Sequence, residues 1–260
     1  MASVNESFEP PWKKWSDEFG NASRATSRDQ IQFDMEEKAL LALLGNKAER
    51  IFDIGCGNGE TLKGLLYAGI TPGAMGGCDM LADFVETAKK ELPGAVLFQM
   101  DLMDNAHGGW DKIKDFRPTF VIVKRVLCNL SGRKTQRGAV CHICEQLPSG
   151  ARITMIEPMM DGLMKLNHLR ATFGLELITE PPFNEYLRWA DISATLEHSG
   201  MKDIRRHDHT STYHVGSRVL QPFLHPGVEP KYDHPINKFF SGLPVREGFG
   251  MHWVISAVKK

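Results

Sequence analysis

A carboxylate and three glycines stand at alternate positions in one short stretch, at Asp53, Gly55, Gly57 and Gly59. The stretch begins in an apolar run that predicts a strand, and a helical pattern begins at Glu60. Glycines at such a junction leave backbone N–H groups open to a bound ligand. The spacing therefore predicts a ligand-binding loop, and the alternative is a tight turn that binds nothing.

The loop does not fit a dinucleotide. A G-x-G-x-x-G fingerprint needs its third glycine three residues after the second, and here that residue is Glu60. A carboxylate at the start of the helix would repel a pyrophosphate, which binds at a helix N-terminus. NAD and FAD are therefore disfavoured, whereas a cationic ligand without phosphate is compatible with nearby carboxylates.

Two further carboxylates stand at the ends of predicted strands. Asp79, followed by Met80, ends the second strand, and Asp101 and Leu102 directly follow the third, at residues 95–100. Ligands of parallel α/β sheets bind beyond the carboxyl ends of the strands. Asp79 can therefore accept both hydroxyls of a ribose. Asp101 can accept from an adenine amino group while the Leu102 N–H donates to a ring nitrogen. For both acids the alternative is a capping or loop-fixing role.

Together these residues resemble the first motifs of class I S-adenosylmethionine (SAM) dependent methyltransferases. The resemblance covers residues 50 to about 158. It implies an α/β fold with a doubly wound, seven-stranded, mostly parallel sheet, the Rossmann-like methyltransferase fold, whose last strand is antiparallel. It also implies SAM as the cofactor in an extended pose, with Asp79 at the ribose and Asp101 with Leu102 at the adenine. Met80 belongs to the same predicted cofactor site.

The end of the fourth predicted strand, residues 120–123, separates reaction types within this family. The N-P-P-Y motif of amide-targeting DNA methyltransferases is missing. The strand ends at Lys124 and not at an acid like the magnesium ligand of catechol O-methyltransferases. The sequence therefore predicts no catalytic metal. Lys124 and Arg125 either contact the carboxylate of the cofactor or an anionic substrate, or they are solvated charges.

Three residues are candidate catalytic bases. Glu157 ends the fifth predicted strand on the ligand side, where it either belongs to the site or fixes a loop. His209 and His214 follow a strand predicted at residues 203–206, in a stretch expected to be extended. An imidazole is largely neutral at pH 7 and can accept a proton. The alternative for the histidines is a position in a surface loop.

Three segments lie outside the minimal fold. Residues 1–32 form an N-terminal arm that either packs its aromatic side chains on the core or, as in the family it resembles, forms a lid. In the lid, Trp15 and Arg24 would face the methionine end of the cofactor. Residues 158–189 are rich in methionine and leucine, and residues 210–248 are too long for a hairpin turn. We expect both segments to cap the substrate site.

Composition limits the classes of protein that fit. A chain of 260 residues with 42% apolar residues can form one methyltransferase domain, residues 1–260. Lys and Arg (31) nearly balance Asp and Glu (32), which disfavours a nucleic-acid partner. The sequence shows no long apolar stretch and no signal pattern, so no membrane partner is expected. Five cysteines suit a reducing compartment, and we expect a soluble, cytoplasmic protein.

The sequence therefore predicts a SAM-dependent methyltransferase. The expected acceptor is a hydroxyl or an amine of a polar small molecule, such as a sugar or a natural product. One alternative is a methyltransferase that acts on protein or RNA, and another is a SAM-binding protein without catalytic activity.

Overall fold

Seven strands form one sheet in the computed structural model, which describes residues 28–44, 49–104 and 108–260. The strands are β1 (Arg50–Ile54), β2 (Ala74–Asp79), β3 (Val96–Gln99), β4 (Phe120–Lys124), β5 (Arg152–Pro158), β6 (Met201–Asp208) and β7 (His252–Lys259). Their order is β3-β2-β1-β4-β5-β7-β6. β1 to β5 are parallel, and β7 lies antiparallel between β5 and β6. The predicted seven-stranded, doubly wound sheet with an antiparallel last strand is confirmed.

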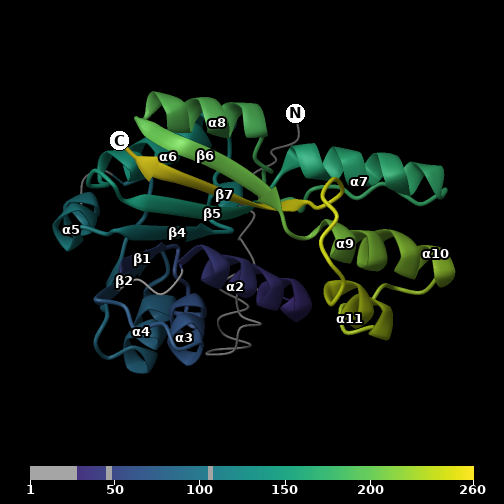
Figure 1. Ribbon diagram of the computed structural model, residues 1–260, viewed down its shortest axis with the longest axis horizontal. Coiled ribbons are helices and arrows are strands. Elements are labelled where there is room, and N and C mark those ends of the chain that lie inside the picture. Colours follow the sequence, from purple (N-terminus) through teal and green to yellow (C-terminus); the bar gives the residue numbers. More distant parts are fainter. Residues whose placement is uncertain (1–27, 45–48, 105–107) are drawn as a thin grey trace, which may run out of the picture.

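Helices cover both faces of the sheet (Figure 1). One face carries α5 (Gly109–Phe116), α6 (Arg133–Glu145) and α8 (Trp189–His198), and the other carries α2 (Gln30–Leu44), α3 (Glu60–Tyr67) and α4 (Ala82–Glu91). Because both faces are covered, the central strands read as continuous apolar runs such as Phe-Val-Ile-Val in β4. None of the helices in the described residues is long and apolar enough to span a bilayer.

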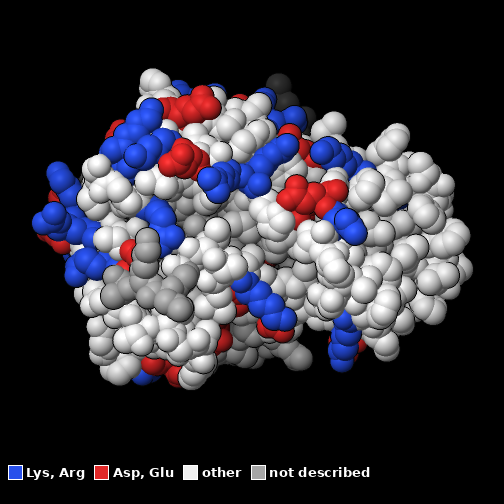
Figure 2. Space-filling view, in the orientation of Figure 1, with Lys and Arg blue, Asp and Glu red and all other residues white. Residues whose placement is uncertain are grey.

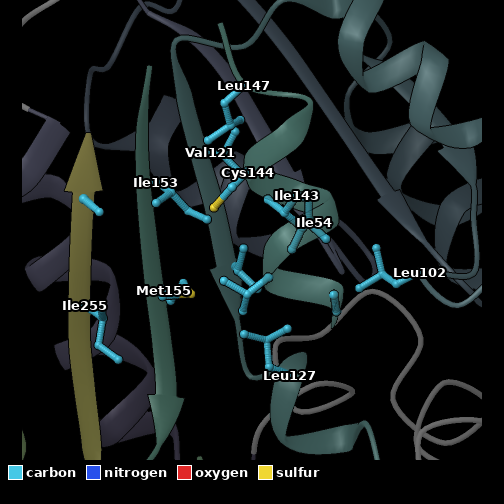
Figure 3. Close-up of a cluster of buried hydrophobic side chains, with 14 of the residues drawn as sticks. Ile54, Leu102, Val121, Leu127, Ile143, Cys144, Leu147, Ile153, Met155 and Ile255 are labelled. Atoms are coloured by element: carbon cyan, nitrogen blue, oxygen red, sulfur yellow. The ribbon is translucent and has the colours of Figure 1, made fainter. Parts of the chain in front are cut away.

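The packing of α6 shows how helical spacing builds the core. Ile143 and Cys144 of α6 lie against Val121 of β4 and against Ile153 and Met155 of β5 (Figure 3). All five side chains are at most 1% exposed. The C-x-x-C spacing in this helix places its second cysteine in the core, where a thiol packs as a small apolar group.

A lobe stands beyond the carboxyl end of β5 (Figure 1). It contains α7 (Met160–Thr172), α9 (Ser211–His214), the π-helix η3 (Val215–Leu220), α10 (Gln221–Leu224) and α11 (Pro235–Ser241). These helices come from the two predicted insertions, residues 158–189 and 210–248, which we call the cap lobe. The insertions pack on each other through a separate apolar cluster that includes Leu166 and Val219. Two segments distant in sequence therefore form one structural unit.

A glycine joins the cap lobe to the sheet. Gly162 lies in the first turn of α7, and a Cβ at this position would lie 2.0 Å from the carbonyl oxygen of Gly250. Backbone therefore packs directly on backbone where α7 passes the segment that leads into β7. A residue with a side chain would force these two segments apart.

One local expectation differs from the structure. The stretch after β6 is not extended, because β6 ends at Asp208 and α9 begins at Ser211. Helix α2 begins at Gln30, where the Asp29 carboxylate accepts the Gln32 N–H at 3.0 Å. A carboxylate in this position satisfies a donor that the first helical turn leaves unpaired.

Candidate active site

A cavity of about 770 Å³ lies at the carboxyl ends of the parallel strands and extends to the cap lobe. Its wall contains eight of the residues singled out in the sequence, which are Gly55, Gly57, Asp79, Met80, Asp101, Leu102, Lys124 and Arg125. The five others that the structure describes are not on the wall; these are Asp53, Gly59, Glu157, His209 and His214. Trp15 and Arg24 lie outside the described residues, as does most of the predicted arm.

The glycine loop adopts backbone angles that favour glycine. Gly55, Gly57 and Gly59 have φ values of 74°, 53° and 83°. The N–H groups of Gly55 and Cys56 donate to the Cys78 carbonyl at 2.8 and 2.9 Å, which fixes the loop against β2. A Cβ on Gly55 would lie 2.2 Å from Val126 Cγ2. Gly59 turns the chain into α3 and does not reach the cavity.

Asp79 fastens the end of β2 to the glycine loop. Its carboxylate accepts the Gly57 N–H at 2.9 Å and the Leu81 N–H at 3.0 Å. Burial raises the pKa of Asp79, and these backbone donors oppose the shift. Each carboxylate oxygen has a second lone pair. Asp79 can therefore hold the loop and still accept hydrogen bonds from a ligand in the cavity.

Asp101 and Leu102 form the next part of the wall. Asp101 Oδ1 accepts the Met103 N–H at 2.8 Å, so the carboxylate also fixes its own turn. Leu102 is buried, and Met100 and Met103 line the same region of the cavity. An exposed carboxylate beside apolar side chains suits a flat heterocycle with an amino group.

Asp53 lies behind the loop and not in the cavity. The side chain is 2% exposed, and no described residue hydrogen-bonds to its Oδ1. Burial raises the pKa of Asp53 to about 8, Lys124 opposes the shift, and Glu37 and Asp79 add to it. The native state therefore favours the neutral form of this carboxyl group.

Replacing Asp53 with asparagine is expected to stabilise the protein at pH 8 by on the order of a few kcal/mol. The native state holds a proton on Asp53 up to about pH 8, whereas the unfolded chain loses it near the usual value of 3.8. Wild-type stability therefore falls as pH rises between these values, and the asparagine variant lacks this loss. Urea unfolding at pH 5 and pH 8 measures the difference. If the stability gained by the asparagine variant did not increase with pH, the raised pKa of Asp53 would be contradicted.

Lys124 and Arg125 are paired with acids of α2. Lys124 Nζ lies 2.6 Å from Glu37 Oε1, and Arg125 Nε lies 3.5 Å from Glu36 Oε2. The Lys124 side chain is 6% exposed, so the expectation of a solvated charge is wrong for this residue. Arg125 therefore lies on the wall near β4, and the buried Glu36 carboxylate lies behind it.

Glu157 fixes the turn after β4. It is fully buried, and its Oε1 accepts the N–H groups of Val126 and Leu127 at 2.8 and 2.9 Å. Its Oε2 accepts the Cys128 N–H at 3.3 Å. Burial raises the pKa of Glu157 to about 7, and the backbone donors oppose the shift. Of the two roles expected for Glu157, the geometry supports the loop-fixing one.

His209 and His214 pack inside the protein and not in a surface loop. His214 Nδ1 accepts the Met251 N–H, and its Nε2 lies 2.9 Å from Gln32 Oε1. Both ring nitrogens of His214 are therefore occupied. His209 has no hydrogen-bond partner among the described residues, and burial lowers its pKa to about 4. Neither imidazole reaches the cavity, so we do not assign either one as a base.

Three residues at this site are absent from the predictions made from the sequence. Gln32 and His252 are on the cavity wall, and Glu36 lies directly behind them. The one available signal was Glu36, a carboxylate within the apolar pattern of a helix, because a buried charge needs a partner.

No three His, Cys, Asp or Glu residues in the described ranges could hold a metal ion, and metal-independent activity stays a prediction.

Comparison with known proteins gives this architecture a name. No protein-family model and no curated protein matches the sequence. A chain from the complex of the Haloferax volcanii Trm112 methyltransferase activator with a methyltransferase matches with a TM-score of 0.61, at 11% identity, covering 97% of this chain and 99% of that one. A SAM-dependent methyltransferase from Archaeoglobus fulgidus has a TM-score of 0.53, at 14% identity, covering 88% and 94%. The chain has the fold of SAM-dependent methyltransferases.

A further protein with this methyltransferase fold is the SAM-dependent methyltransferase from Methanosarcina mazei. Its TM-score is 0.51 at 15% identity, with 85% of this chain and 96% of that chain covered. The expected fold family is therefore confirmed by structures and not by sequence matches. In this methyltransferase fold, the cavity described above lies where the strand order reverses, between β1 and β4.

Proposed function

We propose that the protein is a SAM-dependent methyltransferase whose acceptor is a polar small molecule. The observation that carries the proposal is the continuous cavity, which runs from Asp79 and Asp101 at the strand ends to Tyr186 and Tyr232 of the cap lobe. The first end suits a nucleoside, and the second suits an acceptor that the cap lobe encloses. Bound SAM would supply an electrophilic methyl group.

The enclosure favours a small molecule over a protein or an RNA. The acceptor end of the wall is formed by aromatic and polar side chains of the cap lobe, including Phe183, Asn184 and Tyr186. Figure 2 shows blue and red residues interspersed over the sheet and few charges over the cap lobe. An RNA substrate would favour a continuous basic tract, because phosphate contacts dominate such binding.

The chain's own residues can position the acceptor and take its proton. Methyl transfer is an in-line displacement, and holding the attacking atom about 3 Å from the methyl carbon can contribute ~7–11 kcal/mol. Of the histidines in the described ranges, His252 is the one on the wall. Its Nδ1 lies 3.2 Å from Glu36 Oε1. A proton accepted by this imidazole would be stabilised by the Glu36 carboxylate.

The activity test uses the full chain. Calorimetry measures SAM binding, and incubation with SAM and a panel of sugars, polyols, phenols and amines measures formation of S-adenosylhomocysteine. We expect binding and turnover with at least one hydroxyl compound. Binding without turnover, also after addition of peptides and RNA, would favour the non-catalytic alternative. No binding of SAM would reject the proposal.

Replacing Asp79 with alanine is expected to weaken SAM binding by about 1.5–3 kcal/mol, or about 10- to 150-fold in Kd. The substitution removes the predicted ribose acceptor and also releases the Gly57 N–H. Asp83→Ala is the matched control, because Asp83 is an exposed acid of α4 outside the cavity. Calorimetry that shows unchanged affinity in a folded Asp79 variant would reject the assignment.

A further inference from the structure

The cap lobe brings a guanidinium group to the cavity wall. Arg218 lies in η3, and its charged side chain is only 18% exposed. Its guanidinium carbon lies 5.7 Å from the centre of the Tyr213 ring and 5.1 Å from that of Tyr232. Arg218 and Tyr232 both line the cavity. The rings hold the cation in place, since an aromatic face attracts a positive charge.

One ion pair fixes Arg218 and leaves most of its donors unused. Its Nη2 lies 2.7 Å from Asp29 Oδ2. The Tyr213 hydroxyl donates to both oxygens of Asp29, at 2.8 and 2.9 Å, which fixes the carboxylate in turn. A guanidinium has five N–H donors. Asp29 occupies one of these donors and the Tyr213 hydroxyl interacts with the same guanidinium, which leaves further donors for a molecule in the cavity.

A second arginine lies beside Arg218. Arg170 of α7 donates to the Arg218 backbone carbonyl and, through Nε, to the Glu176 carbonyl at 2.8 Å. Burial and the Arg218 charge lower the pKa of Arg170, against a smaller opposite effect of Glu176. Two guanidinium groups thus lie close together, and Asp29 is ion-paired with only one of them. An anion at this end of the cavity would relieve their repulsion.

Three other cations line the wall, which are Arg28, Lys124 and Arg125. Lys124 and Arg125 each face a carboxylate of α2, and both lie near the sheet. Arg218 lies in η3 of the cap lobe and is paired with Asp29, just before α2. A guanidinium presents its donors as a planar fork, which matches the paired oxygens of a carboxylate or a phosphate.

We propose that Arg218 binds an oxyanion of the methyl acceptor, a carboxylate or a phosphate group. The acceptor is then an acidic small molecule, such as a sugar acid, a sugar phosphate or an acidic natural product. The inference rests on the proposed function, because it assigns the cap end of the cavity to the acceptor. The methyl group goes to a different atom of the same molecule, so the oxyanion fixes position and specificity and does not react.

The first test measures anion binding to the full chain without SAM. Calorimetry and thermal shift use acetate and inorganic phosphate at up to tens of millimolar. We expect wild-type protein to bind one of them, Arg218→Gln to lose at least about tenfold in affinity, and exposed Arg205→Gln to behave as wild type. The anion that binds distinguishes a carboxylate from a phosphate. No binding to wild type, or equal binding to Arg218→Gln, would overturn the proposal.

The second test separates acceptor from cofactor. SAM affinity should stay within about twofold of wild type in Arg218→Gln, because the nucleoside end of the cavity lies on other elements. A tenfold loss of SAM affinity would mean that Arg218 binds the carboxylate of SAM, and it would overturn the proposal. Arg218→Lys keeps a charge beside Asp29 and controls for folding. It should keep the melting temperature of the wild type, and it should nevertheless bind the anion more weakly than the wild type does. If wild type binds an anion and not SAM, the proposed function fails independently.

Discussion

Replacing Glu157 with alanine is expected to lower the free energy of unfolding by about 3–5 kcal/mol. The carboxylate accepts the backbone N–H groups of Val126, Leu127 and Cys128, all in the turn that follows β4. Alanine would leave these buried or partly buried donors without an acceptor. Because Val126 and Cys128 also line the cavity, the variant should lose ligand affinity together with stability.

The matched control for this prediction is Glu157→Gln. Glutamine keeps a carbonyl oxygen of similar length that can accept two of the donors, and it removes the cost of burying a charge. We expect Glu157→Gln to lower the free energy of unfolding by less than half as much as Glu157→Ala does. Urea unfolding at pH 8 gives both values. Equal stability of alanine variant and wild type would show that the turn does not depend on Glu157. Strong loss of turnover in a stable Glu157→Gln variant would restore the catalytic interpretation.

Replacing His252 with glutamine is expected to lower turnover with a hydroxyl acceptor at least ~100-fold, the usual contribution of a general base. The imidazole lies on the cavity wall, and Glu36 behind it can stabilise the charge that forms when a proton is accepted. Glutamine keeps a polar side chain and cannot take a proton at neutral pH. SAM affinity should stay within about twofold, because the nucleoside end of the cavity is unchanged.

His207→Gln is the control for His252. His207 is an exposed histidine of β6 whose partner is Glu247, and it does not line the cavity. Its replacement should leave turnover unchanged. An amine acceptor, which reacts through a neutral lone pair, should also be less sensitive to His252→Gln than a hydroxyl acceptor. If His252→Gln turned over a hydroxyl compound as fast as the wild type, catalysis would have to come from positioning of the acceptor alone.

The sequence alone predicted the sheet and the residues that meet at the carboxyl ends of its strands. A strand that ends in a carboxylate and leads into a helix is a local pattern, and parallel strands bring their carboxyl ends to one edge. Asp79 and Asp101 therefore meet at the cavity wall, although they belong to different βα units. The glycine spacing also predicted the loop, because positive φ values are a property of single residues.

The end of the cavity that we propose for the acceptor was decided by contacts between segments far apart in the chain. Gln32 and His252 are 220 positions apart, and Asp29 and Arg218 are 189 positions apart. No periodicity links such residues. Which histidine reached the cavity depended on how the second insertion folded, and its helix α9 turned His214 inward toward Gln32. Local pattern fixes where elements begin and end, whereas partners across the fold follow from how two surfaces pack and pair their buried charges.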